Sequence, residues 1–579
     1  MLQSFYIKIN KKRFKARFSE TILEVAQRNN IFIPTLCYHS DLKVKENCRI
    51  CLVKIKGEKE LKTSCSVKVK PGMEIFTDTP EIKKLRKLNL ELIFTQHSQE
   101  CHDCVWFSRC QLLDLTKKYQ ADTSRFSNRK EKRPVYKFDS ALIYDSKKCI
   151  DCRNCVEVCQ NQGVGFLELK GQGADIRVVP SEDKNKDCVY CGQCLIHCPA
   201  GSFEGVGEFE EVETPLKQKG KKVIFQFAPA VRTSLGEEFG FPLRTPLTGK
   251  LIAGIKSLGV DKVFDVSLGA DFTTMEEAKE LITKLEDKRK LPLMTSCCPA
   301  WVKYIEFYYP EFIPYLTSVR SPHIILGGLI KTYWAQREKI NPQDIFVVSV
   351  MPCVAKKYEI TRPELKIKGL KPVDYVLTTR GLAQLFRKYK VDLNKIKPLQ
   401  ADHPLGYHSG AGIIYGATGG VMESALRTTQ AMLNEKEISK IEFKKVRGMK
   451  GVKRALVKIK GKSLKIGVVN GLGFAKEILE KLKENPDLFD YLEVMACPGG
   501  CIGGGGQPIP TSKKIRNKRA QGLYQLDKKR TIRTAHQNPV IKEVYRDFLK
   551  NKKTAHYLCH THYSRKFKKG LNILPPGQY

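Results

Sequence analysis

The sequence predicts a multidomain protein that combines small α+β units with a large α/β unit. Three features of its 579 residues support this prediction. The first eighty residues read as short strands around one helical segment, Ser19–Asn30, which opens with a serine N-cap. Cysteines then recur at short spacings as far as residue 200. From Val223 onward, strand-like apolar runs alternate with helical runs, which is the α/β pattern.

The composition indicates a folded protein of a reducing compartment. Hydrophobic residues make up 42% of the chain, as in globular proteins, and no apolar run is long enough to cross a bilayer. The start, MLQSFYIKINKKRF, lacks the features of a signal peptide. We therefore expect a cytoplasmic location without membrane insertion, where closely spaced cysteines are metal ligands more often than disulfides.

Lysine and arginine exceed the acidic residues by 40. A nucleic-acid partner is the first interpretation of such a charge, but the lysines are spread along the whole chain and form no single basic arm. We therefore expect no nucleic-acid binding. A basic surface that attracts acidic protein partners is the preferred interpretation.

Residues 1–80 contain four cysteines that suit a [2Fe–2S] cluster, with zinc as the alternative. These ligands are Cys37, Cys48, Cys51 and Cys65. The segment PTLCYHSDLKVKENCRICLVKI (Pro34–Ile55) resembles the [2Fe–2S] domain at the head of the large iron–sulfur subunit of respiratory complex I. The resemblance implies a β-grasp fold for this unit.

Residues 81–136 are expected to form a small helical unit with a further metal site. Its candidate ligands are His97, Cys101, Cys104 and Cys110. On a helix, His97 and Cys101 would face one side because they lie four residues apart, and His102 is the competing histidine. The spacing resembles the [4Fe–4S] site of the same complex I subunit, which is held by one histidine and three cysteines.

A cysteine pattern occurs twice within residues 137–210. Each copy reads Cys-x2-Cys-x2-Cys-x3-Cys, followed by Pro199 in the second copy and by Gln160 in the first. This is the spacing of two-cluster ferredoxins, in which the fourth cysteine of each run ligates the other cluster. Zinc would need two pairs rather than two runs of four. We expect one [4Fe–4S] cluster on Cys149, Cys152, Cys155 and Cys198, and another on Cys188, Cys191, Cys194 and Cys159.

Residues 220–579 contain four strand-like runs that each end at an unusual residue. KVIFQF leads into Ala228, LPLMTS into Cys297, DIFVVSVMP into Cys353 and FDYLEVMA into Cys497. In open α/β sheets, ligands gather beyond the carboxyl ends of the strands. We therefore expect these residues to converge on one crevice.

Three motifs of this last unit resemble the signatures of [FeFe]-hydrogenases. They are TSCCPAW (Thr295–Trp301), MPCVAKKYE (Met351–Glu359) and EVMACPGGCIGGGGQP (Glu493–Pro508), and the resemblance extends through Gly416–Thr429 to CHTHY (Cys559–Tyr563). The whole chain is similar to the larger, ferredoxin-linked form with four accessory clusters. The resemblance implies reversible conversion of protons and electrons into H₂, a ferredoxin or similar acidic carrier as partner, and maturation proteins that install the cofactor.

The resemblance also implies the cofactor and its site. The H-cluster is a [4Fe–4S] cluster joined to a di-iron unit with CO, CN⁻ and a bridging dithiolate amine. Its implied ligands are Cys298, Cys353, Cys497 and Cys501, with Cys501 as the bridge. The residues implied around the di-iron unit are Ala228, Pro229, Ala230, His323, Met351, Lys356 and Met495. We expect the glycines of Gly499–Gly506 to let the backbone approach this cofactor closely.

A proton relay completes what the resemblance implies. Cys297 matches the proton-carrying thiol, and Lys356 matches a lysine that donates to a cyanide. Protons would then pass along Glu277, Thr317, Glu280 and Lys284, where threonine and lysine stand for the family's usual serine and arginine. A solvated acidic face is the alternative for the two glutamates.

Two departures from the family pattern lie close to the implied cofactor. Ala230 stands where a serine is common, and His323 stands where glutamine is usual. A titratable ring there would alter redox potential, catalytic bias or pH response, so we expect His323 to influence activity below neutral pH. These changes keep an H₂-sensing protein with low turnover open as an alternative. A hydrogenase subunit of an NAD-linked complex is another, while the intact Cys297 and Cys501 argue against an assembly scaffold.

Overall fold

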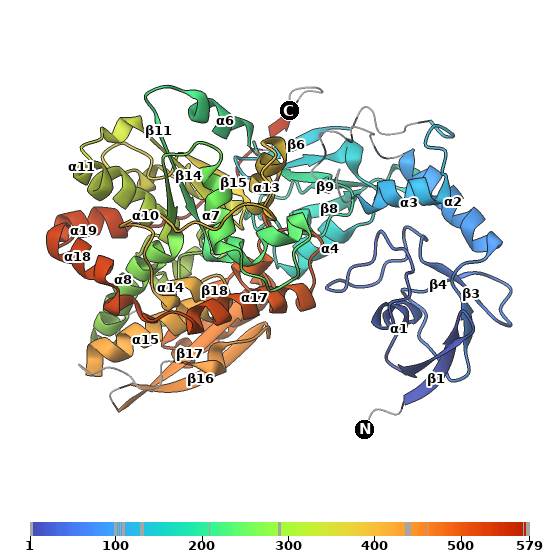
Figure 1. Cartoon of the computed structure of the whole chain (residues 1–579). Helices are drawn as coiled ribbons and strands as arrows, with labels where there is room; N and C mark the ends of the chain where they lie inside the picture. Colours follow the sequence, from blue (N-terminus) through green and yellow to red (C-terminus); the bar gives the residue numbers. More distant parts are fainter. Residues whose placement is uncertain are drawn as a thin grey trace.

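The computed structural model describes most of the chain and arranges it as four connected parts (Figure 1). The described residues are 4–95, 97, 101, 104, 106, 110–127, 133–207, 209–287, 291–434, 442–459, 461–570 and 572–574. Among them, no helix is both long and apolar enough to cross a bilayer.

The N-terminal unit is a five-stranded mixed sheet around one helix, in the order β2-β1-β5-β3-β4. Its elements are β1 (Ser4–Ile9), β2 (Lys12–Arg17), α1 (Ile22–Arg28), β3 (Leu52–Ile55), β4 (Lys62–Thr63) and β5 (Glu74–Phe76). The helix begins later than the serine N-cap predicts. Thr21 is the N-cap, because its hydroxyl accepts from Glu24 N while the Glu24 carboxylate accepts from Thr21 N.

Two helices form the next unit, α2 (Pro80–Phe94) and α3 (Gln111–Tyr119). Because α2 ends at Phe94, neither His97 nor Cys101 is helical. The expectation that a helix turns both toward one side is therefore wrong. His102, the competing histidine, lies outside the described residues.

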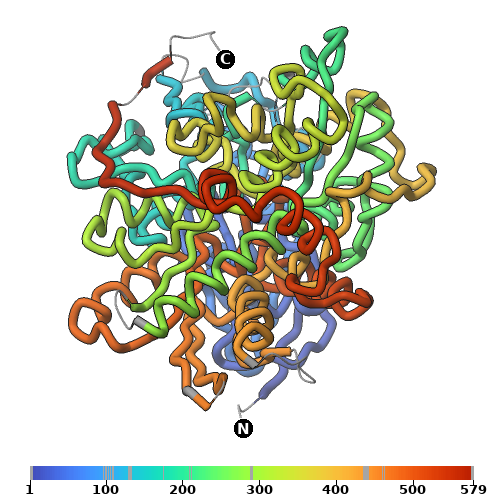
Figure 2. The backbone as a smooth tube through the Cα atoms, turned by 90° about the vertical axis from the view of Figure 1, so that its left-hand side faces the viewer, coloured from blue at the N-terminus to red at the C-terminus, as the bar shows by residue number. Residues whose placement is uncertain are grey.

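The cysteine-repeat unit carries two short helices on small sheets. The helices are α4 (Asn154–Asn161) and α5 (Gln193–Ile196). One sheet consists of β8 (Leu167–Lys170) and β9 (Arg177–Pro180), and the other consists of β6 (Val135–Phe138), β7 (Leu142–Asp145), β10 (Phe203–Gly205) and β19 (Asn572–Leu574). The last strand comes from the far end of the chain and pairs antiparallel with β6. Figure 2 follows the C-terminal segment, in red, across one face of the molecule toward this strand.

The C-terminal unit contains two four-stranded sheets. The first has the order β12-β11-β14-β15, is parallel throughout, and consists of β11 (Lys222–Phe227), β12 (Lys262–Asp265), β14 (Ile345–Met351) and β15 (Tyr375–Thr378). The second has the order β13-β18-β17-β16 and consists of β13 (Leu293–Met294), β16 (Val452–Ile459), β17 (Lys462–Asn470) and β18 (Tyr491–Met495). β11 and β18 are almost fully buried, as expected for strands covered on both faces.

Helices cover both sheets and lie between them (Figure 1). The long α8 (Val266–Asp287) follows β12 directly and packs against α10 (Pro322–Leu329), α14 (Gly410–Ile414) and α15 (Gly420–Asn434). The other helices of this unit are α6 (Glu210–Lys217), α7 (Thr248–Lys256), α9 (Pro299–Tyr308), α11 (Ala335–Arg337), α12 (Ala355–Glu359), α13 (Thr379–Lys388), α16 (Leu472–Glu484), α17 (Lys513–Lys528), α18 (Pro539–Asp547) and α19 (Lys552–Cys559).

Candidate active site

Twelve of the expected site residues line one cavity in the C-terminal unit. The cavity encloses about 740 Å³ that protein atoms do not fill, its open side included. It lies where the carboxyl ends of β11 and β14 in one sheet meet those of β13 and β18 in the other. The expected residues in its wall are Ala228, Pro229, Ala230, Cys297, Cys298, His323, Met351, Cys353, Lys356, Met495, Cys497 and Cys501.

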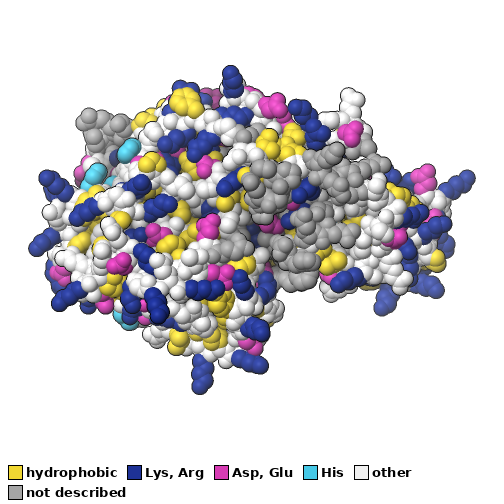
Figure 3. Space-filling model, turned by 90° about the horizontal axis from the view of Figure 1, so that it is seen from above, with side chains coloured by type: hydrophobic (Ala, Val, Ile, Leu, Met, Phe, Trp, Pro, Cys, Tyr) yellow, Lys and Arg dark blue, Asp and Glu magenta, His cyan; other side chains and the backbone are white. Residues whose placement is uncertain are grey.

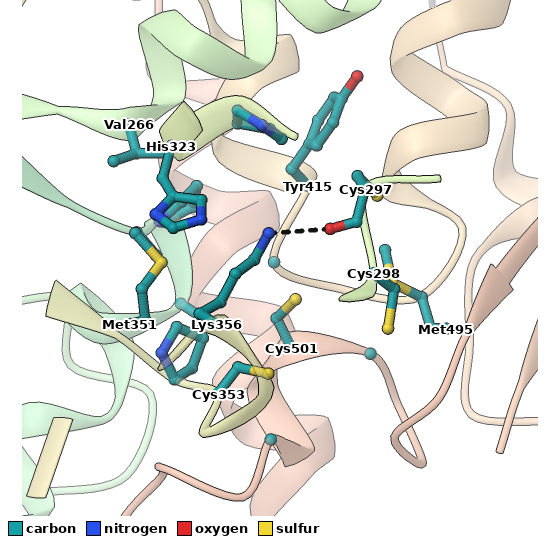
Figure 4. Close-up of a pocket in the computed structure, with 18 of the residues that line it drawn as sticks. Val266, Cys297, Cys298, His323, Met351, Cys353, Lys356, Tyr415, Met495 and Cys501 are labelled. Atoms are coloured by element: carbon teal, nitrogen blue, oxygen red, sulfur yellow. Dashed lines mark hydrogen bonds between the residues drawn. The ribbon is translucent and has the colours of Figure 1, made fainter. Parts of the chain in front are cut away.

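Four cysteines of this wall form a candidate cluster site. Cys298, Cys353 and Cys501 extend into the same space in Figure 4, and Cys497 lines the same cavity. Burial raises the pKa of all four thiols, to about 12 for Cys353. Such thiols become thiolates only when a metal compensates the charge. The donor set therefore fits an iron–sulfur cluster.

Lys356 supplies the buried positive charge of the cavity. Its Nζ donates to the carbonyl of Cys297 at 3.1 Å (dashed in Figure 4) and to Glu359 Oε2 at 2.7 Å. Burial lowers the pKa of Lys356, but the Glu359 carboxylate outweighs this and leaves the pKa raised. The side chain is therefore an ammonium that can face an anionic cofactor ligand.

His323 is held on the other side of the same carboxylate. Its Nε2 lies 2.6 Å from Glu359 Oε2, and its Nδ1 lies 3.1 Å from Ser349 Oγ. Burial, followed by the charge of Lys356, lowers the pKa of His323 to about 4. The ring is therefore neutral above that pH, and a change in its charge belongs near pH 4 rather than near neutrality.

The glycine loop around Cys501 places Gly500 and Gly504 in the cavity wall, and it has a second constraint besides the expected one. A Cβ on Gly504 would lie 2.1 Å from the carbonyl oxygen of Pro352, and one on Gly505 would lie 2.7 Å from Cα of Gly192. These contacts are to the protein's own backbone. The glycines therefore let three chain segments pack against one another behind the cavity.

Glu277, the inner glutamate of the expected relay, is fully buried on α8 at 0% exposure. Tyr491 donates to its Oε2 at 3.1 Å, and its Oε1 has no hydrogen-bond partner among the described residues. Burial raises the pKa of Glu277 to about 8, so the carboxyl holds a proton at neutral pH. Burial, and next the charge of Glu277, raises the pKa of Cys297, which indicates that the two groups are neighbours.

The outer relay residues lie nearer the surface. Thr317 Oγ1 donates to Glu280 Oε2 at 2.6 Å, and Lys284 Nζ lies 3.5 Å from Glu280 Oε1. The side chains of Glu280 and Lys284 are 19% and 16% exposed. A solvated acidic face therefore describes Glu280 in part, but it does not describe Glu277.

In the cysteine-repeat unit, the fourth thiol of each run lies with the first three of the other run. Burial is the main cause of the raised pKa of Cys152, and Cys198 is the next. Cys188 and Cys194 likewise have pKa values raised by burial, with Cys159 among the further causes. Cys198 is therefore near Cys152, and Cys159 is near Cys188 and Cys194, while the exchange of ligands between the two clusters stays a prediction.

The N-terminal thiols come from the segment between α1 and β3 and, for Cys65, from the residues just after β4. Hydrogen bonds between side chains raise the pKa of Cys37 beside Cys48 and that of Cys65 beside Cys51. The backbone N–H of Cys37 also donates to Cys48 Sγ at 3.4 Å. The four candidate [2Fe–2S] ligands are thus in one place.

His97 and its three candidate partners lie beside the cysteine-repeat unit. His97 Nδ1 lies 2.8 Å from the carbonyl oxygen of Lys148, so Nε2 is the candidate ligand atom. The charge of Cys101 contributes to the raised pKa of Cys110, and that of Cys110 to the raised pKa of Cys104, after burial in each case.

Tyr415 is a cavity residue that the motifs do not single out. Its hydroxyl lies 2.9 Å from Thr274 Oγ1 on α8, and its ring forms part of the wall beside Cys297 (Figure 4). The only sequence signal is its place immediately before Gly416. Cys559, by contrast, is buried in the hydrophobic core, away from the cavity wall.

Cysteine-rich small domains that lead to a thiol-lined cavity between two α/β sheets define an iron–sulfur oxidoreductase. Comparison with known families agrees. "Iron only hydrogenase large subunit, C-terminal domain" matches residues 221–505, and "Iron hydrogenase small subunit" matches 513–566. A 2Fe-2S iron-sulfur cluster binding domain matches 3–80, and a 4Fe-4S dicluster domain matches 148–202.

The relatives give the family. NADP-reducing hydrogenase subunit HndD of Solidesulfovibrio fructosivorans is 38% identical, covering 97% of this chain and 99% of its own. Iron hydrogenase 1 of Clostridium pasteurianum is 35% identical over 96% and 99%. The structure of an apo form of [FeFe]-hydrogenase HydA1 from Chlamydomonas reinhardtii matches with a TM-score of 0.55 and 36% identity, over 61% of this chain and 98% of that one. The chain belongs to the [FeFe]-hydrogenase family, oxidoreductases that act on H₂.

Proposed function

We propose that this [FeFe]-hydrogenase catalyses 2H⁺ + 2e⁻ ⇌ H₂ with ferredoxin or a similar acidic carrier as its electron partner. The observation that carries the proposal is the convergence of twelve expected residues on one cavity. The H-cluster supplies the chemistry of H₂ when it is bound. Its ligands would be Cys298, Cys353, Cys497 and Cys501, with Cys501 as the bridge to the di-iron unit.

The remaining wall residues exclude water and set charge. Ala228, Pro229, Ala230, Met351 and Met495 line the cavity with apolar surface. Lys356 offers an ammonium to an anionic ligand, and Glu359 keeps it charged. His323 contributes a neutral ring above pH 4.

Protons pass between the cavity and solvent along a route that begins at buried residues and ends at the partly exposed Glu280 and Lys284. Cys297 exchanges a proton with the buried carboxyl of Glu277, whose raised pKa suits it to hold one at neutral pH. Thr317 and Glu280 continue the route through their 2.6 Å hydrogen bond, and Lys284 ends it. The hydroxyl of Thr317 can both accept and donate, which is what the serine of the family pattern would do.

The four accessory cysteine groups would each hold an iron–sulfur cluster, and these clusters would supply electron transfer toward the cavity. The Cys188 group is the last, because Cys497 Sγ lies 3.9 Å from the carbonyl oxygen of Cys191. The four N-terminal cysteines are connected to the cysteine-repeat group that contains Cys198 by a contact between His39 and His197, whose ring centroids lie 4.2 Å apart. The His97 group joins it through the carbonyl of Lys148.

The partner follows from charge. Figure 3 shows lysine and arginine side chains over most of the visible face, in keeping with an excess of 40 basic residues. A place in an NADP-linked complex is the second candidate, because HndD is similar over 99% of its length and is named an NADP-reducing hydrogenase subunit. Reduced ferredoxin offered to the purified chain, without any partner subunit, separates the two. The first candidate predicts salt-sensitive H₂ production with ferredoxin alone.

Two cysteine substitutions test the site after anaerobic maturation by maturation proteins. Cys297→Ala should keep the iron content and the infrared bands of metal-bound CO and CN⁻, yet lose nearly all turnover. Cys501→Ala should lose those bands, because the bridge to the di-iron unit is gone. Wild-type protein that shows the bands but little turnover would favour an H₂ sensor, and absence of the bands would refute the proposed site.

A further inference from the structure

A hydroxyl and an imidazole connect Glu280 to the surface on a path separate from Lys284. We propose that the proton route forks at Glu280, and that Ser318 and His560 form the second branch to solvent. This inference deepens the proton relay of the proposed function and rests on it. None of these residues is a candidate metal ligand or a neighbour of one.

A continuous set of contacts makes up the branch. Glu280 Oε2 accepts from the backbone N–H of Ser318 at 3.2 Å and from its hydroxyl at 3.4 Å, beside the bond from Thr317. Ser318 Oγ lies 2.9 Å from His560 Nδ1. His560 Nε2 in turn lies 3.1 Å from Glu276 Oε2.

The backbone fixes this geometry. Val319 and His560 form an antiparallel β-bridge, and Thr561 N donates to the carbonyl of Ser318 at 2.8 Å. Arg320 Nε donates to the carbonyl of His560 at 2.6 Å. The segment that follows α19 is therefore held against the outer end of the relay by main-chain bonds, so side-chain substitutions should leave it in place.

Glu276 orients the imidazole. Burial raises the pKa of Glu276, but hydrogen bonding to His560 and the charge of Lys279 overcome this and lower the pKa to about 2. An anionic carboxylate at Nε2 favours the tautomer with its hydrogen on Nε2, which leaves the lone pair of Nδ1 facing Ser318.

Proton transfer through the branch then conserves atoms and charge. Protonated Glu280 gives its proton to Ser318 Oγ while Ser318 gives its hydroxyl proton to His560 Nδ1. The carboxyl becomes a carboxylate, and the imidazole becomes an imidazolium. The His560 side chain is 18% exposed and can pass the proton to water. In the direction of H₂ production, the same steps run inward.

Other charged and titratable groups face His560 from every neighbouring element. Lys279 on α8 pairs with Glu276 at 2.8 Å, and Tyr545 on α18 donates to the same carboxylate. The ring of His556 on α19 stacks on that of His560 with 5.6 Å between centroids. Arg320 faces the backbone of His560, because its Nε donates to the His560 carbonyl. Of these charged and titratable groups, Glu276 bonds directly to the imidazole of His560, and the other direct partner of the ring is the Ser318 hydroxyl. An imidazole exchanges protons near neutral pH far more readily than an ammonium.

The test is a set of variants of the matured holoenzyme. His560→Ala, Ser318→Ala and Lys284→Met should each keep a substantial share of turnover, because one branch remains. The double variants that combine Lys284→Met with either of the other two should fall at least about tenfold below Lys284→Met, since positioned proton transfer contributes roughly 10²–10⁴-fold. Added imidazole should restore His560→Ala/Lys284→Met but not Ser318→Ala/Lys284→Met, a result that a purely structural role would not give.

His562→Ala is the matched control, because His562 is exposed and lies in the same segment. Iron content and the infrared bands should be unchanged throughout. A double variant no slower than Lys284→Met would overturn the second branch while leaving the relay intact. If Cys297→Ala retained turnover, the relay itself would fail instead.

Discussion

Replacing Glu277 by glutamine should stabilise the protein and inactivate it at the same time. The carboxyl has 0% exposure, and burial raises its pKa from 4.5 to about 8. Glutamine has nearly the same shape and keeps an oxygen that accepts from Tyr491. It cannot gain and lose a proton, so turnover should fall by roughly 10²-fold or more.

The gain in stability follows from linkage. Below pH 4.5 the carboxyl is protonated in both the folded and the unfolded chain, and it has no effect. Between pH 4.5 and about 8 the unfolded chain releases the proton while the folded chain retains it, so the free energy of unfolding falls as pH rises. Over this interval the loss reaches on the order of 5 kcal/mol, which the glutamine variant avoids.

Urea unfolding of wild type and variant at several pH values measures this difference, and H₂ production measures turnover. The two midpoints should coincide near pH 4 and separate as the pH approaches 8. Wild-type H₂ production should also decline above pH 8, where the carboxyl loses its proton. A variant that is less stable than wild type at pH 8, or that keeps wild-type turnover, would refute the buried protonated carboxyl.

Three further variants, one of them with a matched control, probe other parts of the structure. His323→Gln should leave the pH profile of H₂ production unchanged above pH 5 and remove a transition near pH 4, because the ring is already neutral above its pKa; a change at pH 7 would contradict this. Gly505→Ala should slow electron entry from a carrier and lower the unfolding midpoint, since its Cβ would lie 2.7 Å from backbone, whereas Gly570→Ala, with nothing within 4 Å, should behave as wild type. Asp41→Asn should weaken docking of the N-terminal unit by breaking the 2.7 Å pair with Arg516, seen as faster proteolysis of that unit at unchanged iron content.

Sequence patterns predict those parts of this structure in which short-range spacing fixes geometry. The four strand runs end at the cavity because an apolar run must be buried, and the residue after it then lies at the edge of the sheet. In the cysteine runs, the spacing of two residues between successive cysteines places three thiols around one point. The family resemblance adds His323 and Lys356, whose places in the cavity wall no local pattern indicates.

Contacts between distant segments are the parts that the sequence did not reveal. Gly505 is glycine because Gly192 lies against it, more than three hundred residues away. The role of His560 likewise depends on its contact with Ser318, which lies more than two hundred residues away. Each requires knowing which segments meet, and a single sequence does not carry that information.

The last strand of the chain has a practical consequence. β19 forms the edge strand of the sheet of the cysteine-repeat unit by pairing with β6, so the C-terminal segment connects the C-terminal unit to that sheet. A purification tag fused after residue 579, or loss of the final ten residues during handling, would disturb the cysteine-repeat unit rather than the cavity of the C-terminal unit. Such preparations would keep H₂ turnover with a dye as the electron donor but lose it with a protein electron carrier.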